Sequence, residues 1–191
     1  MPANRRQFLQ AAGNLAVAGS LPIVTRPSYA KEPQALLPIV DTHQHLWDLN
    51  RFQPPWLKDA PPILTKSYVT KDYLAATAKV NVTKAVYMEI DVAPQQQVQE
   101  AKHVIDLSRS KDHPTSAAVI SGRPNSSEFA AYINQFKDVT EIKGVRQVLH
   151  VDSAPRGLCL EPTYVLSIQL LGKLVKSFDL CMRRTELSDG K

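Results

Sequence analysis

Short apolar runs alternate along the chain with longer segments whose apolar residues recur at spacings of three and four. Each short run is rich in Val, Ile, Leu, Phe or Tyr, which is typical of strands covered on both faces of a parallel sheet. The predicted strands are 39–42, 84–90, 116–121, 142–150 and 176–182. The longer segments predict amphipathic helices at 70–80, 94–110, 126–136 and 161–174. This alternation is typical of repeated βα units and a parallel α/β sheet.

The predicted elements are too few to close an eight-stranded βα barrel. Such a barrel typically needs about 250 residues, whereas this chain has 191. The pattern is therefore compatible with a small open α/β sheet or with the first part of a barrel. Between the first predicted strand and the first predicted helix, the stretch 47–68 has no regular period and holds several prolines. We expect it to be a long loop over one end of the sheet, a kind of connection that is usually functional.

The first 30 residues have the composition of an export signal. A charged start with Arg5 and Arg6 precedes an apolar stretch and small residues that end at Ala30. The Arg-Arg-x-Phe-Leu core resembles a twin-arginine signal, which is a receptor-read address and not an anchor. We predict a twin-arginine-type signal peptide at 1–30, a domain at 31–191, export to the periplasm and no stable membrane anchor. The alternative is a retained amphipathic anchor at the N-terminus.

The charge balance argues against a nucleic-acid partner. The chain has 23 Lys and Arg against 18 Asp and Glu, but three of the arginines lie in the first 30 residues, which hold no acid. The remainder is left with 20 basic against 18 acidic residues and lacks the clustered basic patch that a polyanion requires. A small-molecule substrate is therefore the expected partner. The two cysteines, Cys159 and Cys181, match no metal-ligand spacing, and Cys181 is interpreted as a small buried hydrophobe.

Asp41, His43 and His45 form the strongest candidate site. Side chains at i, i+2 and i+4 share one face of a strand, so these three project together from the carboxyl end of the first predicted strand. Two adjacent imidazoles are suited to bind a divalent ion such as zinc or manganese. Asp41 would orient an imidazole from behind. Alternatively, each histidine is an ordinary core or surface residue.

Polar residues on later strands are expected at the same end of the sheet. Arg146 and His150 share one face of the fourth predicted strand, and Glu89 ends the second on the face that carries Tyr87. A guanidinium on the inner face of a barrel needs an acid or a substrate carboxylate as partner. Arg146, His150 and Glu89 are therefore candidate substrate contacts. The alternative is a structural ion pair of Arg146 with Glu89 or Asp179.

Three segments together resemble the amidohydrolase-related family, which contains sugar lactonases and the pyrone dicarboxylate lactonase. The first is Ile-Val-Asp-Thr-His-Gln-His-Leu-Trp-Asp at 39–48, followed by Pro-Trp-Leu at 55–57. The others are Gly-Val-Arg at 144–146 with His150, and Phe-Asp-Leu-Cys-Met at 178–182. The resemblance implies a distorted TIM barrel, here a partial (β/α)8 barrel of about five βα units. It also implies hydrolysis of a lactone or similar small polar ester or amide. His43 and His45 would bind the metal, and Arg146 and His150 would bind the substrate.

The resemblance also implies residues that this sequence does not contain. Family members complete the site with a histidine on a late middle strand and an aspartate at the last strand, which acts as metal ligand or general base. The catalytic base is therefore unknown here and expected beyond the C-terminus. Two alternatives follow: a truncated inactive remnant or small-molecule binding module, and a metal-free lactonase in which His43 and His45 polarise the substrate. A half-open parallel sheet is also expected to dimerise or aggregate, so a homo-oligomer is possible.

Overall fold

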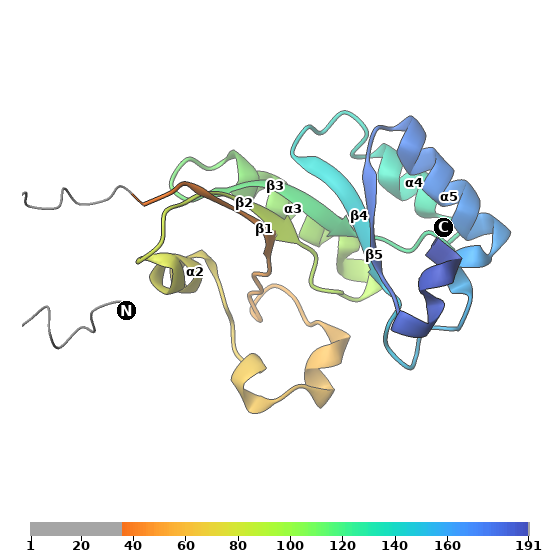
Figure 1. Cartoon of the computed structure of the whole chain (residues 1–191), viewed down its shortest axis with the longest axis horizontal. Helices are drawn as coiled ribbons and strands as arrows, with labels where there is room; N and C mark the ends of the chain where they lie inside the picture. The colour runs from red at the N-terminus through yellow and green to blue at the C-terminus, as the bar shows by residue number, and fades with distance from the viewer. Residues whose placement is uncertain (1–35, 191) are drawn as a thin grey trace, which may run out of the picture. The chain divides into compact units, whose positions relative to one another are not determined.

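The computed structural model describes residues 36–190 and shows one five-stranded parallel sheet. The strands are β1 (Ile39–Gln44), β2 (Val82–Met88), β3 (Thr115–Ser121), β4 (Ile142–Val148) and β5 (Ser177–Cys181). They lie side by side in chain order, and every neighbouring pair is parallel. Figure 1 shows this sheet between the helices and the long β1–α2 connection. The predicted signal peptide lies outside the described residues.

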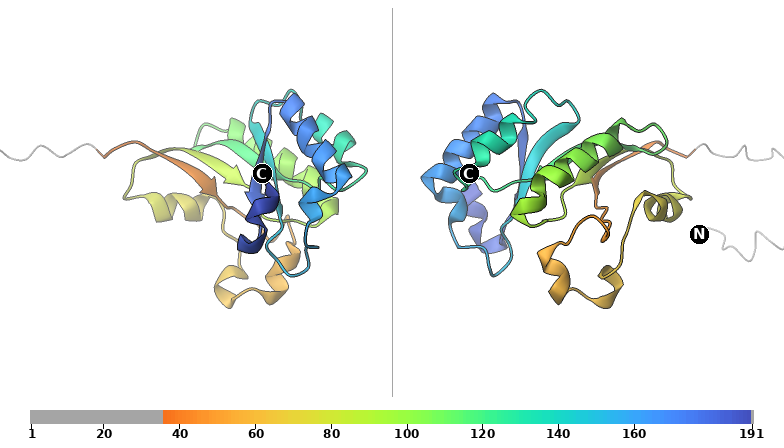
Figure 2. Two further views of the ribbon diagram at one scale, coloured as in Figure 1. Left: turned by 45° about the vertical axis from the view of Figure 1, so that its right-hand side comes forward. Right: turned by 180° about the vertical axis from the view of Figure 1, so that it is seen from behind.

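Each strand is joined to the next by a helical connection. The helices are α2 (Thr70–Thr77), α3 (Gln97–Arg109), α4 (Phe129–Asn134) and α5 (Pro162–Lys173). Short 3-10 turns accompany them at Pro55–Asp59, Pro62–Leu64, Pro94–Gln96, Leu158–Leu160 and Arg184–Gly190. The views of Figure 2 show α3, α4 and α5 along one face of the sheet. The described part is thus a parallel α/β half-barrel, which agrees with the parallel sheet that the sequence pattern predicts and with the partial barrel that the family resemblance implies.

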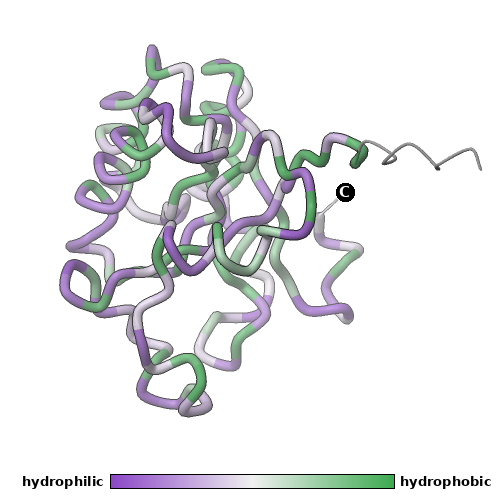
Figure 3. Tube along the Cα trace, turned by 90° about the vertical axis from the view of Figure 1, so that its left-hand side faces the viewer, coloured by the Kyte–Doolittle hydropathy of each residue, from purple (hydrophilic) through white to green (hydrophobic). Residues whose placement is uncertain are grey.

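The main hydrophobic core lies between the sheet and these three helices. The strands contribute fully buried Tyr87, Ile120 and Val145, and the helices contribute side chains such as Ile133 and Leu171. Burying an aliphatic side chain of this size contributes roughly 1.5–3 kcal/mol. In Figure 3 the helices carry both hydrophobic and hydrophilic positions, as expected for helices with one face on a core. This packing fixes the other face of the sheet, which carries the candidate site.

All five predicted strands and all four predicted helices are present, but one predicted facing is wrong. Tyr87 and Glu89 were expected on the same face because they are two residues apart. Strand β2 ends at Met88, and beyond it the alternation breaks down. The Tyr87 hydroxyl points to Glu100 on α3, whereas the Glu89 carboxylate lies toward Arg146 on β4. Glu89 therefore reaches the site because it lies past the end of regular pleating.

The two outer strands are more exposed than the inner three. Within the described residues, β1 pairs only with β2, and β5 pairs only with β4. Val40 on β1 and Leu180 on β5 are each 55% exposed, although both are large apolar residues. Among the helices that the structure describes, we find none with the length and apolar character needed to cross a membrane.

Candidate functional site

His43 and His45 lie together at the carboxyl end of β1. Their Nε2 atoms are 3.1 Å apart, and their rings meet edge to face. The Nδ1 atom of His45 lies 3.0 Å from the carbonyl oxygen of Met88. Because a carbonyl oxygen only accepts hydrogen bonds, Nδ1 of His45 carries the proton and Nε2 presents its lone pair. The fold therefore prepares Nε2 of His45 to accept a proton or bind a metal.

The electrostatic surroundings keep His45 neutral. Burial is the main cause that lowers the pKa of His45, and the nearby Arg146 and His43 lower it further. A metal binds only the neutral form of an imidazole. His43, in contrast, is exposed at the surface of the sheet end. The pair thus combines one fixed, neutral imidazole with one accessible imidazole.

The distance between the two Nε2 atoms fits a shared metal ion. Two zinc–nitrogen bonds of about 2.0–2.1 Å at a tetrahedral angle place their nitrogen atoms roughly 3.3 Å apart. The observed 3.1 Å is close to this value and is also the length of an imidazole–imidazole hydrogen bond. Among the described residues, we find no group of three or more His, Cys, Asp or Glu arranged around one metal position. These residues therefore provide at most two ligands.

The carboxylate of Asp41 contacts the backbone of His43, and among the described residues it makes no hydrogen bond to either imidazole, which it was expected to orient. Its Oδ1 accepts a hydrogen bond from the backbone N–H of His43 at 3.1 Å. Its Oδ2 accepts one from the hydroxyl of Tyr73 on α2 at 2.8 Å. Burial, followed by this contact with Asp41, raises the pKa of Tyr73 to about 12. Asp41 thus connects α2 to the backbone of His43, and sequence reasoning had no signal for Tyr73.

Arg146 and Glu89 form a buried ion pair beside the histidines. Nε of Arg146 lies 2.5 Å from Oε1 of Glu89, and Nη2 donates to the Glu89 carbonyl oxygen at 3.2 Å. The other carboxylate oxygen accepts hydrogen bonds from the Ser121 hydroxyl at 2.8 Å and the backbone N–H of Asp91 at 2.5 Å. The Glu89 side chain is fully buried and that of Arg146 is 11% exposed. Of the two possible partners, Arg146 therefore pairs with Glu89 and not with Asp179.

The ion pair with Glu89 leaves the Nη1 group of Arg146 available for hydrogen bonding. Both oxygens of Glu89 are occupied, so its carboxylate has little capacity for a substrate. The Nη1 group of Arg146 has no hydrogen-bond partner among the described residues. Ser121 was not a predicted site residue, although its place two residues after Val119 on β3 would have put it on the inner face.

His150 lies just past the end of β4 and contacts Cys181 on β5. Its Nδ1 is 3.2 Å from the Cys181 Sγ. Cys181 is half-buried, which corrects its interpretation as a small buried hydrophobe. Burial is the main cause that raises the pKa of the Cys181 thiol, so the sulfur stays protonated at neutral pH and is a poor nucleophile. Both cysteines are free.

The long loop between β1 and α2 is held against the sheet by two tryptophans. Trp56 Nε1 donates to the carbonyl oxygen of Ile90 at 2.7 Å, just past β2. Trp47 packs edge to face on Trp56 and donates through Nε1 to Lys66 at 2.8 Å. The loop thus closes back on the carboxyl ends of β1 and β2, as its length and aromatic content indicated.

Comparisons with known proteins found one curated relative and several solved structures similar to this chain. No protein-family model matches the chain. A curated relative, the uncharacterized protein y4mH of Sinorhizobium fredii, is 25% identical over 128 residues, which cover 61% of this chain and 42% of that protein. Among solved structures, amidohydrolase 2 from Bifidobacterium longum subsp. infantis is 26% identical with a TM-score of 0.58, over 81% of this chain and 55% of that one.

Two further solved structures share the fold at lower identity. An amidohydrolase from Burkholderia multivorans with bound zinc is 17% identical with a TM-score of 0.63, over 78% of this chain and 51% of that one. A probable 2-pyrone-4,6-dicarboxylic acid hydrolase from Acinetobacter baumannii with bound citric acid is 14% identical with a TM-score of 0.52, over 73% and 47%. The chain therefore spans about half the length of the proteins it matches.

Proposed function

We propose that this chain, which is an amidohydrolase-related protein, provides the amino-terminal half of a hydrolase active site for a lactone or similar small polar ester or amide. One observation carries the proposal: two imidazole Nε2 atoms converge at 3.1 Å beside a buried Arg–Glu pair. They lie at the carboxyl ends of parallel strands, where barrels of this kind carry their active sites.

His43 and His45 would hold a divalent ion such as zinc or manganese. When bound, such an ion lowers the pKa of a water molecule and polarises a carbonyl oxygen. His45 is held for this role by its Nδ1 contact to Met88, and Asp41 fixes the backbone of His43. The zinc in the Burkholderia structure is consistent with this assignment.

Arg146 and His150 would contact the substrate. Glu89 fixes one edge of the guanidinium and leaves Nη1 for a carboxylate or hydroxyl oxygen of the substrate. His150 follows the end of the same strand and contacts the Cys181 sulfur. The aromatic loop with Trp47 and Trp56 would limit the access of water. A general base would come from outside the described residues, as the family resemblance implies.

A metal-free lactonase is the second candidate. In the observed geometry His43 can donate its Nε2–H to the lone pair of His45 Nε2, so the pair is satisfied without a metal. The two imidazoles would then polarise the substrate carbonyl directly. A small-molecule binding module, without hydrolysis, would use the same contacts. For the whole chain we propose export to the periplasm through the signal at 1–30.

Metal binding tests the first candidate without requiring turnover. We expect the purified chain, loaded with zinc or manganese and desalted, to retain metal by elemental analysis. The double variant His43→Ala/His45→Ala should lose it. The matched control is His103→Ala/His113→Ala, which removes two histidines on and after α3 and should retain the metal. Equal metal content in all three proteins, each verified as folded by circular dichroism, contradicts the metal site.

Chelation separates the metal-dependent from the metal-free candidate. If lactone hydrolysis is detected, loss of the activity in a chelator and its recovery on adding zinc support the metal site. Activity that survives chelation and disappears in His45→Ala supports the metal-free lactonase.

A further inference from the structure

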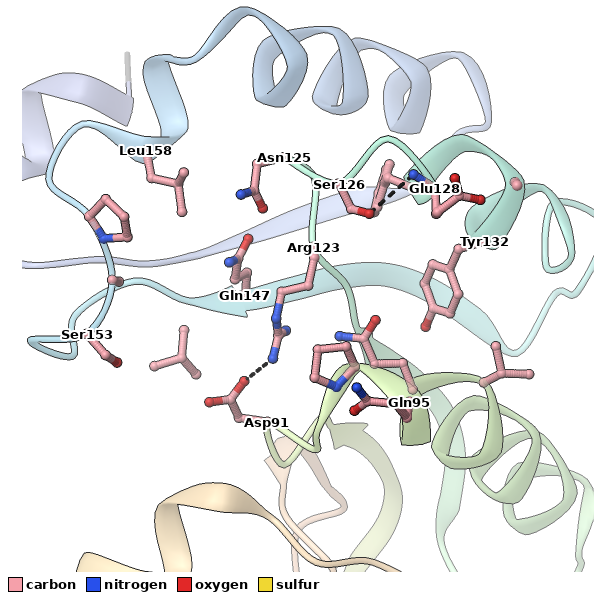
Figure 4. Close-up of a pocket in the computed structure, with 18 of the residues that line it drawn as sticks. Asp91, Gln95, Arg123, Asn125, Ser126, Glu128, Tyr132, Gln147, Ser153 and Leu158 are labelled. Carbon is pink, nitrogen blue, oxygen red and sulfur yellow. Dashed lines mark hydrogen bonds and ion pairs between the residues drawn. The ribbon is translucent and has the colours of Figure 1, made fainter.

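A cavity of about 830 Å³ lies on the helix-covered side of the sheet, outside the barrel-interior face. It is bordered by the start of α3, by α4 with the loop before it, and by the loop that follows β4 (Figure 4). We propose that this cavity binds a neutral, polyhydroxylated ligand of the carbohydrate class. The proposal does not depend on the metal site.

The cavity is bordered by residues of α3, α4 and the segments after β2, β3 and β4, whereas the histidine pair lies at the end of β1. Arg146 points to Glu89 on the inner face, so its neighbour Gln147 projects from the opposite face. Gln147 borders the cavity together with Phe129 and Tyr132 of α4. Figure 4 shows Gln147 beside Arg123 and Asn125, with Tyr132 further along the same wall. The volume falls in the range of about 300–1,000 Å³ that is usual for small-molecule sites.

The lining is rich in neutral carboxamides. The five that border the cavity are Gln95, Gln97, Asn125, Gln135 and Gln147. The hydroxyl groups of Ser126 and Ser153 add to them. The guanidinium of Arg123 lies 2.7 Å from the carboxylate of Asp91, so these two charges compensate each other. Carboxamides and hydroxyls both donate and accept, which is the hydrogen-bonding capacity that sugar hydroxyls require.

Two of these carboxamides each leave a buried atom without a partner. The exposed fraction of Gln97 is 7% and that of Gln147 is 8%. Within the described residues, Nε2 of Gln97 has no acceptor and Oε1 of Gln147 has no donor. Buried polar atoms are nearly always hydrogen-bonded in native proteins, so each of these two carboxamides needs a partner, such as a water or a ligand hydroxyl, that the described residues do not supply.

The charge of the lining favours a neutral ligand. Among the described residues, Arg123 is the one basic residue on the border and is paired with Asp91, so a phosphate or carboxylate would meet no unpaired basic group there. The exposed carboxylate of Glu128, also on the border, disfavours an anion further. A hydroxyl group can pair with a carboxamide in either orientation because it both donates and accepts. Single waters would do so as well, but they would not use the apolar part of the wall.

The apolar part of the wall suits the carbon faces of a sugar ring. Val98, Val148 and Leu158 border the cavity between the carboxamides. Asp91 adopts a positive φ of 49°, a conformation that a short polar residue tolerates. Its carboxylate faces Arg123 across the cavity wall in Figure 4 and leaves Oδ2 free to accept from a ligand hydroxyl.

Calorimetric titration of the full chain tests the proposal with named probes. The neutral probes are myo-inositol, trehalose and maltose, and the anionic comparison probes are citrate and phosphate. We expect saturable binding of at least one neutral probe. Its dissociation constant should rise roughly tenfold in Gln97→Leu and in Gln147→Leu, since each loses one buried hydrogen bond to the ligand. The matched control is Gln99→Leu, an exposed carboxamide on the same helix that does not border the cavity, and its affinity should equal that of the parent.

Two more variants locate the site and guard against misfolding. Ser153→Trp fills the cavity from an exposed position, so it should abolish binding while the protein stays folded. The double variant His43→Ala/His45→Ala should bind the neutral probe as the parent does. The proposal is overturned if no neutral probe binds saturably, if only citrate or phosphate binds, or if the Ser153→Trp variant binds as the parent does.

Discussion

Glu100 on α3 carries a carboxyl group that the fold buries completely. Its Oε1 accepts hydrogen bonds from the Tyr87 hydroxyl and the Ile90 backbone N–H, both at 3.0 Å. Its Oε2 has no partner among the described residues. Burial, and then the neighbouring Glu89 carboxylate, raises the pKa of Glu100 from 4.5 to about 7. The folded chain therefore holds this proton at a pH at which the unfolded chain has released it.

The free energy of unfolding should consequently fall as the pH rises from about 4.5 to about 7. Glu100→Gln mimics the protonated form and removes this dependence. We expect the variant to be about 1–3 kcal/mol more stable than the parent at about pH 8.5 and close to it at about pH 5. Urea unfolding at the two pH values measures the difference, with the exposed Glu128→Gln as control. Asp91, whose pKa burial also raises, affects both proteins equally. An unchanged pH dependence in Glu100→Gln would contradict the prediction.

Residue-level prediction from the sequence succeeded where a side chain belongs to a regular strand. His43 and His45 meet because they are two residues apart at the carboxyl end of β1. It named Glu89 and Asp179 as alternative partners of Arg146 but could not choose between them, because Glu89 lies past the regular end of β2, where alternation no longer predicts the direction of a side chain. The roles of these residues in binding or catalysis remain predictions.

At the scale of elements, β4 and β5 approach each other closely at Gly144. A Cβ on Gly144 would collide with the Ser177 Oγ and lie 2.7 Å from the Ser177 carbonyl oxygen. Because that oxygen belongs to the backbone of β5, the strands would have to separate. Gly172 near the end of α5 has no atom within 4 Å of such a Cβ.

Because their surroundings differ, we expect substitution by alanine to change the free energy of unfolding in opposite directions at the two glycines. We expect Gly144→Ala to lower the free energy of unfolding by about 1–3 kcal/mol through overpacking. Gly172→Ala should raise it by about 0.5–1 kcal/mol, because alanine is the better helix former. Chemical denaturation of both variants measures the difference. Equal effects of the same sign would show that the β4–β5 approach is not as close as described.

Element prediction succeeded in the middles of the elements and failed at their ends. The apolar pattern suggested a helix at 126–136, but α4 covers only Phe129–Asn134. The backbone N–H of Glu128 is bound by the Ser126 hydroxyl and that of Phe129 by the Ser126 carbonyl, so a turn precedes the helix. Periodicity detects the buried face of a helix, whereas local hydrogen bonds set its ends.

At the scale of the whole molecule, the cavity is a feature that the sequence could not predict. Its border joins segments around Gln97, Arg123 and Gln147 that share no sequence pattern. Their proximity follows only from the βα order, which places the loops after β2, β3 and β4 side by side. The number of βα units and the direction of the strands followed from the pattern. A site made by three connections did not.

The two outer strands lead to a prediction about association. Val40 and Leu180 expose apolar side chains on strands that each have one neighbour among the described residues. Unprotected edge strands pair with other chains, and lysine on an edge opposes this pairing. We expect the 191-residue chain to self-associate in sedimentation velocity and Val40→Lys/Leu180→Lys to shift it toward monomer.

Val175→Lys distinguishes association through the strand edges from association through any exposed apolar surface. Val175 is 92% exposed but lies in the connection between α5 and β5, outside both outer strands. If association uses the strand edges, this variant should sediment like the parent, because the substitution removes apolar surface without changing either edge. If Val175→Lys dissociates the chain as strongly as the edge substitutions do, association depends on exposed apolar area in general. A parent chain that is monomeric at all concentrations would instead mean that β1 and β5 are protected without a partner.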